Sequence, residues 1–220
     1  MAGLRRGAIR RRTHSVAFVH IPKTGWEAVR SALLTQRLDR KVLLTGHRND
    51  LGKHSTGTEI LIDVPTIRCI FLVVRDPIDR LFSLYNHLRR WSWDARYFGR
   101  LPNPQISAAF ASCVPFDDFC HRFISGELAS ADTQLRPVTS NIFLKQSQFI
   151  NSVSPEVEVI KLRFSNLAAD LQEFISERFS VKLTDLEVIN ESRSGVLALD
   201  GGTRAMLEEF FAEDYEAFSF

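Results

Sequence analysis

Residues 67–74 read IRCIFLVV, and Arg75, Asp76 and Pro77 follow directly. The run is β-branched or aliphatic almost throughout, which is typical of a parallel strand whose two faces are both covered. Asp76 and Pro77 indicate the start of a helix, with aspartate as the N-cap and proline at the first helical position. This stretch therefore predicts a buried strand that turns into a helix just after Arg75.

The same order of strand and helix recurs along the chain. Apolar runs predict further strands at residues 15–20, 41–44 and 157–162. The spacing of apolar residues predicts helices that begin at Gly25 and near Arg204, and others over residues 116–126, 141–149 and 167–179. Residues 45–58 and 188–199 read as loops. Strands that alternate with helices predict a three-layer α/β fold, a parallel sheet flanked by helices.

The length and composition suit one globular domain. The chain has 220 residues, of which 45% are hydrophobic and 25% are charged, and these fractions are ordinary for a soluble domain of this size. The formal net charge of +2 is too small to indicate nucleic-acid binding. Several arginines crowd residues 1–14, which we interpret as a disordered basic arm. Residues 15–220 are then expected to form a single domain.

Neither a membrane anchor nor a metal site is visible in the sequence. No stretch approaches the ~20 apolar residues that cross a bilayer, and the basic N-terminal tract has no apolar run behind it as a signal peptide would. The three cysteines (Cys69, Cys113 and Cys120) show neither a zinc spacing nor a disulfide framework. We therefore predict a cytoplasmic protein without a transmembrane anchor, in a reducing compartment.

Basic and hydroxyl side chains follow two of the predicted strands. Lys23 and Thr24 come after the strand at residues 15–20, and Arg75 comes after the strand at residues 67–74. Ligands of open α/β sheets bind at the carboxyl ends of the strands. The helix that Gly25 opens presents free N–H groups and a positive dipole end, which favour phosphate or sulfate. Two such strand ends side by side would form a double anion site.

Residues 20–25 (HIPKTG) and 75–85 (RDPIDRLFSLY) resemble the two phosphate-binding motifs of sulfotransferases that use 3′-phosphoadenosine 5′-phosphosulfate (PAPS). The resemblance is greatest to the membrane-type carbohydrate sulfotransferases (sulfotransferase family 2) and their bacterial relatives. It implies the P-loop NTPase-like sulfotransferase fold. It also implies transfer of a sulfuryl group from PAPS to a hydroxyl of a carbohydrate or glycoconjugate acceptor, without a metal.

The resemblance also assigns residues to the donor. Lys23 would contact the bridging oxygen of the phosphosulfate, and the amides of Thr24, Gly25 and Trp26, with the Thr24 hydroxyl, would hold the other oxygens. Residues later in the chain would bind the donor as well. Arg75 and Ser83 would bind its 3′-phosphate, and Arg193 would bind a phosphate from a loop that closes over the nucleotide.

The acceptor side of the site is predicted from other segments. Relatives place a catalytic histidine in a Gly-His segment between the two motifs, which matches His47 as the base for the acceptor hydroxyl, with His54 as the alternative. Arg89, Trp91 and Trp93 combine cations with aromatic faces that suit an acidic sugar. The alternative is that these tryptophans pack against the core.

The chain departs from the family pattern at Trp26, Glu27 and Ala28, where relatives usually carry Gly-Thr-Ser. Two hydroxyls are lost, and a carboxylate stands in the first turn of the anion-binding helix. Facing the phosphates, Glu27 would repel them by ~1–4 kcal/mol at moderate effective dielectric. Either Glu27 points to solvent, or it binds the acceptor or a basic side chain, or donor affinity is weak.

Two other functions remain open from the sequence. One is a non-catalytic protein that binds PAPS or its desulfated product, 3′-phosphoadenosine 5′-phosphate (PAP). The other is a P-loop kinase-like phosphoryl transferase, which requires a Gly-x-x-x-x-Gly-Lys-Ser/Thr loop; the chain has no such glycine loop before Lys23.

Overall fold

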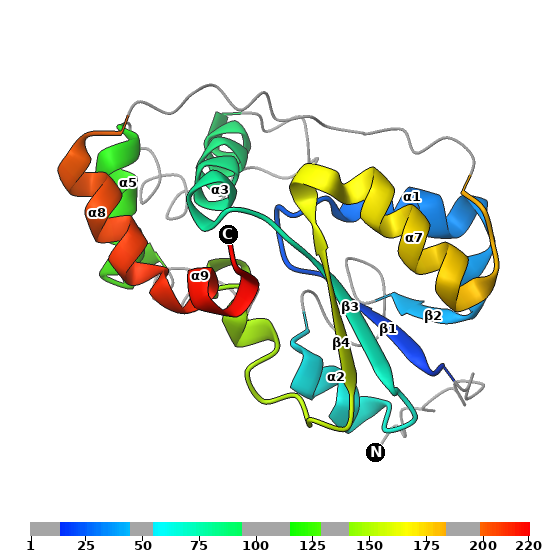
Figure 1. Cartoon of the computed structure of the whole chain (residues 1–220). Helices are drawn as coiled ribbons and strands as arrows, with labels where there is room; N and C mark the ends of the chain where they lie inside the picture. Colours follow the sequence, from blue (N-terminus) through cyan, green and yellow to red (C-terminus); the bar gives the residue numbers. More distant parts are fainter. Residues whose placement is uncertain (1–13, 45–54, 94–114, 129–140, 184–198) are drawn as a thin grey trace, which may run out of the picture.

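A parallel four-stranded sheet forms the centre of the protein (Figure 1). The computed structural model describes residues 14–44, 55–93, 115–128, 141–183 and 199–220, and only the backbone over 88–93. The strands are β1 (Val16–Val19), β2 (Val42–Leu44), β3 (Cys69–Val74) and β4 (Glu158–Arg163), in the order β2-β1-β3-β4. Every residue of β3 is buried, and β3 pairs in parallel with both β1 and β4. The predicted parallel α/β fold is confirmed.

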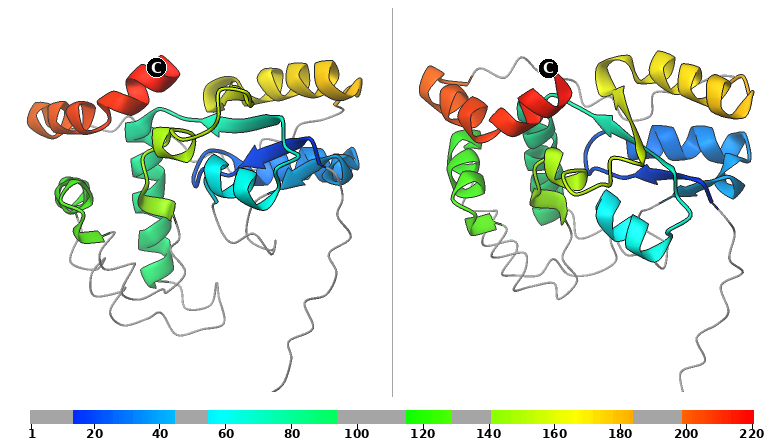
Figure 2. Two further views of the ribbon diagram at one scale, coloured as in Figure 1. Left: turned by 90° about the horizontal axis from the view of Figure 1, so that it is seen from below. Right: turned by 60° about the horizontal axis from the view of Figure 1, so that its bottom comes forward.

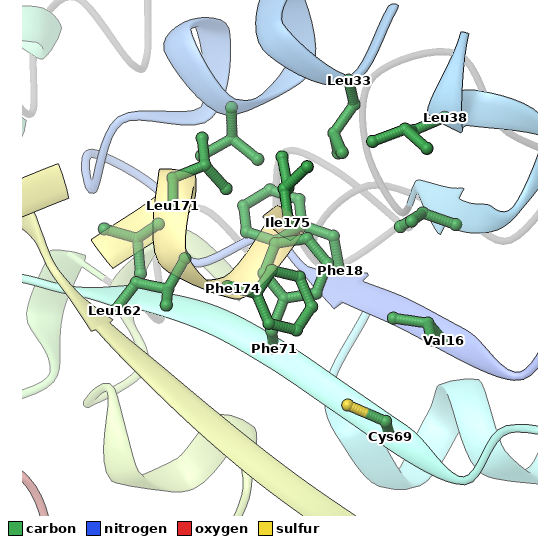
Figure 3. Close-up of a cluster of buried hydrophobic side chains, with 13 residues drawn as sticks. Val16, Phe18, Leu33, Leu38, Cys69, Phe71, Leu162, Leu171, Phe174 and Ile175 are labelled. Carbon is green, nitrogen blue, oxygen red and sulfur yellow. The ribbon is translucent and has the colours of Figure 1, made fainter. Parts of the chain in front are cut away.

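Helices α1 (Trp26–Thr35) and α7 (Leu167–Phe179) cover one face of the sheet (Figure 1). Their apolar sides meet alternate strand residues in a single buried cluster (Figure 3). Aromatic rings run through it: the centroid of Phe71 lies 4.9 Å from that of Phe18 on β1 and 4.5 Å from that of Phe174 on α7. This packing fixes the start of α1 against the carboxyl end of β1.

The opposite face is covered by α2 (Gly57–Asp63), the 3₁₀ turn η4 (Ser147–Phe149) and α9 (Ala212–Phe218). The other set of alternate strand residues is buried there, together with Ile60 and Phe149. The sheet is therefore the middle of three layers, as the sequence predicts.

A second helical group stands beside the sheet (Figure 2). It consists of α3 (Pro77–Trp93), α5 (Phe116–Ile124) and α8 (Gly201–Phe210), which share their own buried cluster. Asp76 caps α3 as predicted, since its carboxylate accepts the backbone N–H of Asp79 at 2.9 Å. The helix thus begins directly after Arg75.

The helix predicted over residues 141–149 is wrong. The segment forms two short 3₁₀ turns, η3 (Asn141–Phe143) and η4, because distant side chains take the backbone groups that a helix would use. The carbonyls of Ile142 and Leu144 accept from Arg80. The N–H groups of residues 146 and 147 donate to Asp214.

Two other elements also differ from the predictions. The predicted loop over residues 45–58 overlaps helix α2, which begins at Gly57 behind a capping box between Thr56 and Glu59. The predicted closing helix is divided at Phe211 into α8 and α9. The division turns the chain so that α8 packs with α5 while α9 returns to the sheet (Figure 1).

The buried cysteines of the described ranges are ordinary core residues. Cys69 and Cys120 are both free thiols, and burial raises the pKa of Cys69 to about 11 and that of Cys120 to about 12, which keeps both protonated. Over the same ranges no helix is long and apolar enough to span a bilayer, and no group of three or more metal-binding side chains is found.

Candidate anion-binding site

The carboxyl ends of β1 and β3 lie next to each other. The two strands pair in parallel with Val19 opposite Leu72. From β1 the chain leads to β2 on one side, and from β3 it leads to β4 on the other. Such a change of direction is where open α/β sheets bind ligands. Lys23 and Arg75, which follow these two strands, therefore leave the sheet at the same edge.

The loop after β1 is tightly wound around Lys23 and Thr24. Lys23 has φ of 71°, a left-handed conformation that costs a non-glycine residue about 1–2 kcal/mol. Thr24 is fully buried, and its hydroxyl donates to the Ile21 carbonyl at 2.8 Å. Because the loop itself uses this hydroxyl hydrogen, the backbone N–H groups at the start of α1 are the donors of this loop that would suit an anion.

Gly25 is required at the start of α1 for two reasons. Its φ of 97° lies in the region that favours glycine. A Cβ atom at this position would lie 3.0 Å from Leu167 and 3.3 Å from the ring of Phe164. The close approach of this ring holds the loop against the end of β4.

Trp26 packs into the layer beneath α1. Its ring stacks on His20 at 4.5 Å between centroids and on Phe18 at 5.6 Å. His20 itself is buried. The indole therefore extends the aromatic core, while the Trp26 backbone keeps its place in the first turn of the helix.

Glu27 faces solvent in this structure. Its side chain is 54% exposed, and the carboxylate lies 3.9 Å from the guanidinium of Arg30, one turn further along α1. Ala28 is buried. Of the possibilities that the sequence leaves open for Glu27, exposure beside a basic side chain is the arrangement found.

Arg75 is a buried cation with an unsatisfied donor. It is 7% exposed, and its Nε has no hydrogen-bond partner among the described residues. Burial lowers the pKa of the Arg75 guanidinium, an effect that the carboxylates of Asp79 and Asp76 oppose. A buried N–H group that lacks an acceptor is costly, so an anion that reaches the Nε of this guanidinium would be bound favourably.

The ring of Phe164 brings the two motifs together. The guanidinium carbon of Arg75 lies 4.5 Å from the centroid of this ring, a cation–π contact. The same ring approaches Gly25. The first turn of α1 and the Arg75 guanidinium thus lie around one side chain. Ser83 is buried two turns into α3, the helix that starts just beyond Arg75.

Arg80 is a structural support of the candidate site, and the sequence reasoning gave it no role of its own. It is buried, and its guanidinium donates to the carbonyls of Pro22 (3.0 Å), Leu144 (2.9 Å) and Ile142 (3.3 Å). Burial lowers the pKa of Arg80 to about 10, with Asp214 acting in the opposite direction. Arg80 therefore ties the residue before Lys23 to α3. Its place inside the second motif was the available signal.

Replacing Arg80 by Met is expected to lower the free energy of unfolding by about 3–5 kcal/mol, since the buried carbonyl of Pro22 and the partly buried carbonyls of Leu144 and Ile142 lose their donor. Urea unfolding followed by circular dichroism measures this change. Arg204→Met is the matched control, because Arg204 pairs with Glu208 at an exposed site and should contribute no more than about 1 kcal/mol. A loss at Arg80 as small as that of the control would contradict the role described.

Several predicted site residues lie outside the described residues: His47, His54 and Arg193. The same holds for residues 1–13 of the arm that is predicted over residues 1–14. The backbone of α3 continues through Arg89, Trp91 and Trp93, but their side chains are outside the description. The base and the acceptor contacts therefore stay predictions.

The fold and this site define a class: an α/β protein with a helix N-terminus and a buried arginine converging at one sheet edge, suited to a ligand with phosphate or sulfate groups. The sequence profile of the sulfotransferase family matches residues 6–220. The chain belongs to the sulfotransferase family. A comparison with curated proteins gives no significant match.

Proposed function

We propose that this sulfotransferase takes the sulfuryl group from PAPS and transfers it to a hydroxyl of a carbohydrate or glycoconjugate. Membership of the family establishes sulfuryl transfer in general. The observation that carries the donor assignment is the buried Arg75 guanidinium with its unpartnered Nε, which contacts the same Phe164 ring that approaches Gly25 after Lys23. A donor with phosphates at both ends of one adenosine matches two cationic positions at neighbouring strand ends.

The described residues suit distinct parts of this donor. Arg75 and Ser83 would hold the 3′-phosphate. The Lys23 ammonium and the N–H groups of Gly25 and Trp26 would hold the 5′ end. These groups place positive charge where negative charge accumulates during transfer, which is commonly the largest catalytic term. When bound, PAPS supplies the sulfuryl group and the PAP leaving group.

The proposed acceptor site consists of residues whose side chains lie outside the part of the chain that the structure describes. His47, or His54 in its place, would accept the proton from the acceptor hydroxyl. Arg193 would add a contact to the nucleotide. Arg89, Trp91 and Trp93 on the second half of α3 would bind the sugar. The cytoplasmic location stays a prediction.

A transfer assay with sulfur-labelled PAPS and a panel of hydroxylated saccharides tests this function. Label is expected in at least one saccharide, without added metal. Binding of PAP without transfer to any acceptor would favour a non-catalytic nucleotide-binding protein. Magnesium-dependent hydrolysis of ATP by a protein that does not bind PAP would contradict the donor assignment and favour a phosphoryl transferase.

Replacing Glu27 by Gln is expected to raise the affinity for PAP by about two- to fivefold at low salt, because it removes a carboxylate from the first turn of the anion-binding helix. The gain should shrink at high salt, since Glu27 is largely exposed and its charge is screened. Calorimetry at two ionic strengths measures both effects. The control is Glu177→Gln, exposed near the far end of α7. A lower affinity after the change would show that Glu27 itself supports binding.

A further inference from the structure

The side-chain amide of Gln146 forms two hydrogen bonds with the backbone of Arg75. The Arg75 N–H donates to Oε1 of Gln146 at 3.0 Å, and Nε2 of Gln146 donates to the Arg75 carbonyl at 2.7 Å. Gln146 is completely buried. The ladder between β3 and β4 ends one residue earlier, at Val74 and Arg163. Gln146 thus supplies the sheet-like hydrogen bonds of Arg75, at the point where the chain turns from β3 into α3.

Gln146 is itself held from the C-terminal helix. Its backbone N–H donates to Oδ2 of Asp214 at 3.0 Å, and the N–H of Ser147 donates to Oδ1 at 2.8 Å. Asp214 lies in α9 and is fully buried. The carboxylate therefore fixes the backbone from which the Gln146 amide reaches Arg75.

The same segment also reaches the first motif. The carbonyls of Ile142 and Leu144 accept from the guanidinium of Arg80, which also donates to the carbonyl of Pro22. We call residues 142–147 the bracket. It contacts Arg75 directly, and it contacts the loop of Lys23 through Arg80.

We propose that Gln146, held by Asp214, is a positioning residue that aims the Arg75 guanidinium at the 3′-phosphate of the donor. This inference rests on the proposed function. A guanidinium binds phosphate best through two parallel N–H bonds, and that geometry fails when the side chain leaves the backbone in another direction. No other described side chain is seen to bond the backbone of Arg75. Gln146 therefore controls recognition of one end of the donor and leaves the other end to the Lys23 loop.

The test compares two nucleotides that differ only in the 3′-phosphate, PAP and adenosine 5′-monophosphate, by calorimetry on the full chain. In Gln146→Met, which keeps the side-chain volume and removes the amide, affinity for PAP is expected to fall by about tenfold. Affinity for the monophosphate should stay within about twofold of wild type. The matched control is Gln148→Met. Gln148 is exposed, and its side-chain amide oxygen accepts a hydrogen bond from the backbone N–H of Lys145.

A double-mutant cycle shows whether Gln146 acts through Arg75. Adding Gln146→Met to Arg75→Met should cost no further affinity for PAP, since no guanidinium is left to aim. If Gln146→Met unfolds at the assay temperature, Gln146→Asn keeps the amide but shortens its reach, and the same selective loss is expected.

Three outcomes would overturn the inference. They are an unchanged affinity for PAP, an equal loss for both nucleotides, and additive losses in the cycle. Each of these leaves the donor assignment standing as long as the wild type prefers PAP. A wild type that binds PAP no better than the monophosphate would instead refute the donor assignment, and this inference with it.

Discussion

Lys23→Ala is expected to lower the rate of sulfuryl transfer by about a hundred- to a thousandfold, the usual cost of removing one group that stabilises developing charge. The left-handed backbone at this position strains alanine as it strains lysine, so stability should hardly change. The measurement is the rate of a single turnover at saturating donor, with thermal unfolding measured alongside.

Two further variants serve as comparisons in this experiment. Lys23→Gly should lose the same activity and gain stability, because glycine adopts the left-handed conformation without strain. Lys182→Ala removes an exposed lysine just beyond the far end of α7 and should leave the rate unchanged. A Lys23→Ala enzyme with wild-type turnover would contradict the assigned role of the first motif.

Arg75→Met is expected to weaken the binding of PAP by about a hundredfold, because a charge-assisted, bidentate phosphate contact is lost. Affinity for adenosine 5′-monophosphate should change much less. Stability should stay the same or rise, since methionine fills the space beside Phe164 and removes a buried charge. Calorimetry with both nucleotides and urea unfolding measure these effects.

The matched control for Arg75 stands at the other end of the same strand. Arg68 just precedes β3 and is exposed, and its guanidinium donates only to the neighbouring carbonyls of Pro65 and Ile67. Arg68→Met should leave both affinities unchanged. A loss of PAP affinity no greater at Arg75 than at Arg68 would remove Arg75 from the site.

The sheet and the two strand ends could be predicted because their signals are local. The apolar run that forms β3 and the cap at Asp76 each lie within a few residues of sequence. The order of the strands, with β1 beside β3, then brings Lys23 and Arg75 to one edge. The motifs identified both positions without any knowledge of packing.

The supports of the site could not be predicted because they join residues far apart in the chain. Arg80 bonds a carbonyl 58 positions away, and Gln146 bonds Arg75 across 71 positions. Apolar periodicity over residues 141–149 predicts one helix, yet these long-range bonds take its backbone groups. The exposure of Glu27 likewise depends on which side of α1 faces the core. Trp26 packs inward on His20, and this packing leaves the next residue, Glu27, facing solvent.

A crystal structure of the protein with PAP tests most directly whether the two motifs hold one donor molecule. We predict the 5′-phosphate at the loop of Lys23 and the start of α1, and the 3′-phosphate on the guanidinium of Arg75, within a single nucleotide. A nucleotide bound elsewhere, or one whose phosphates contact only one of the two motifs, would contradict this account.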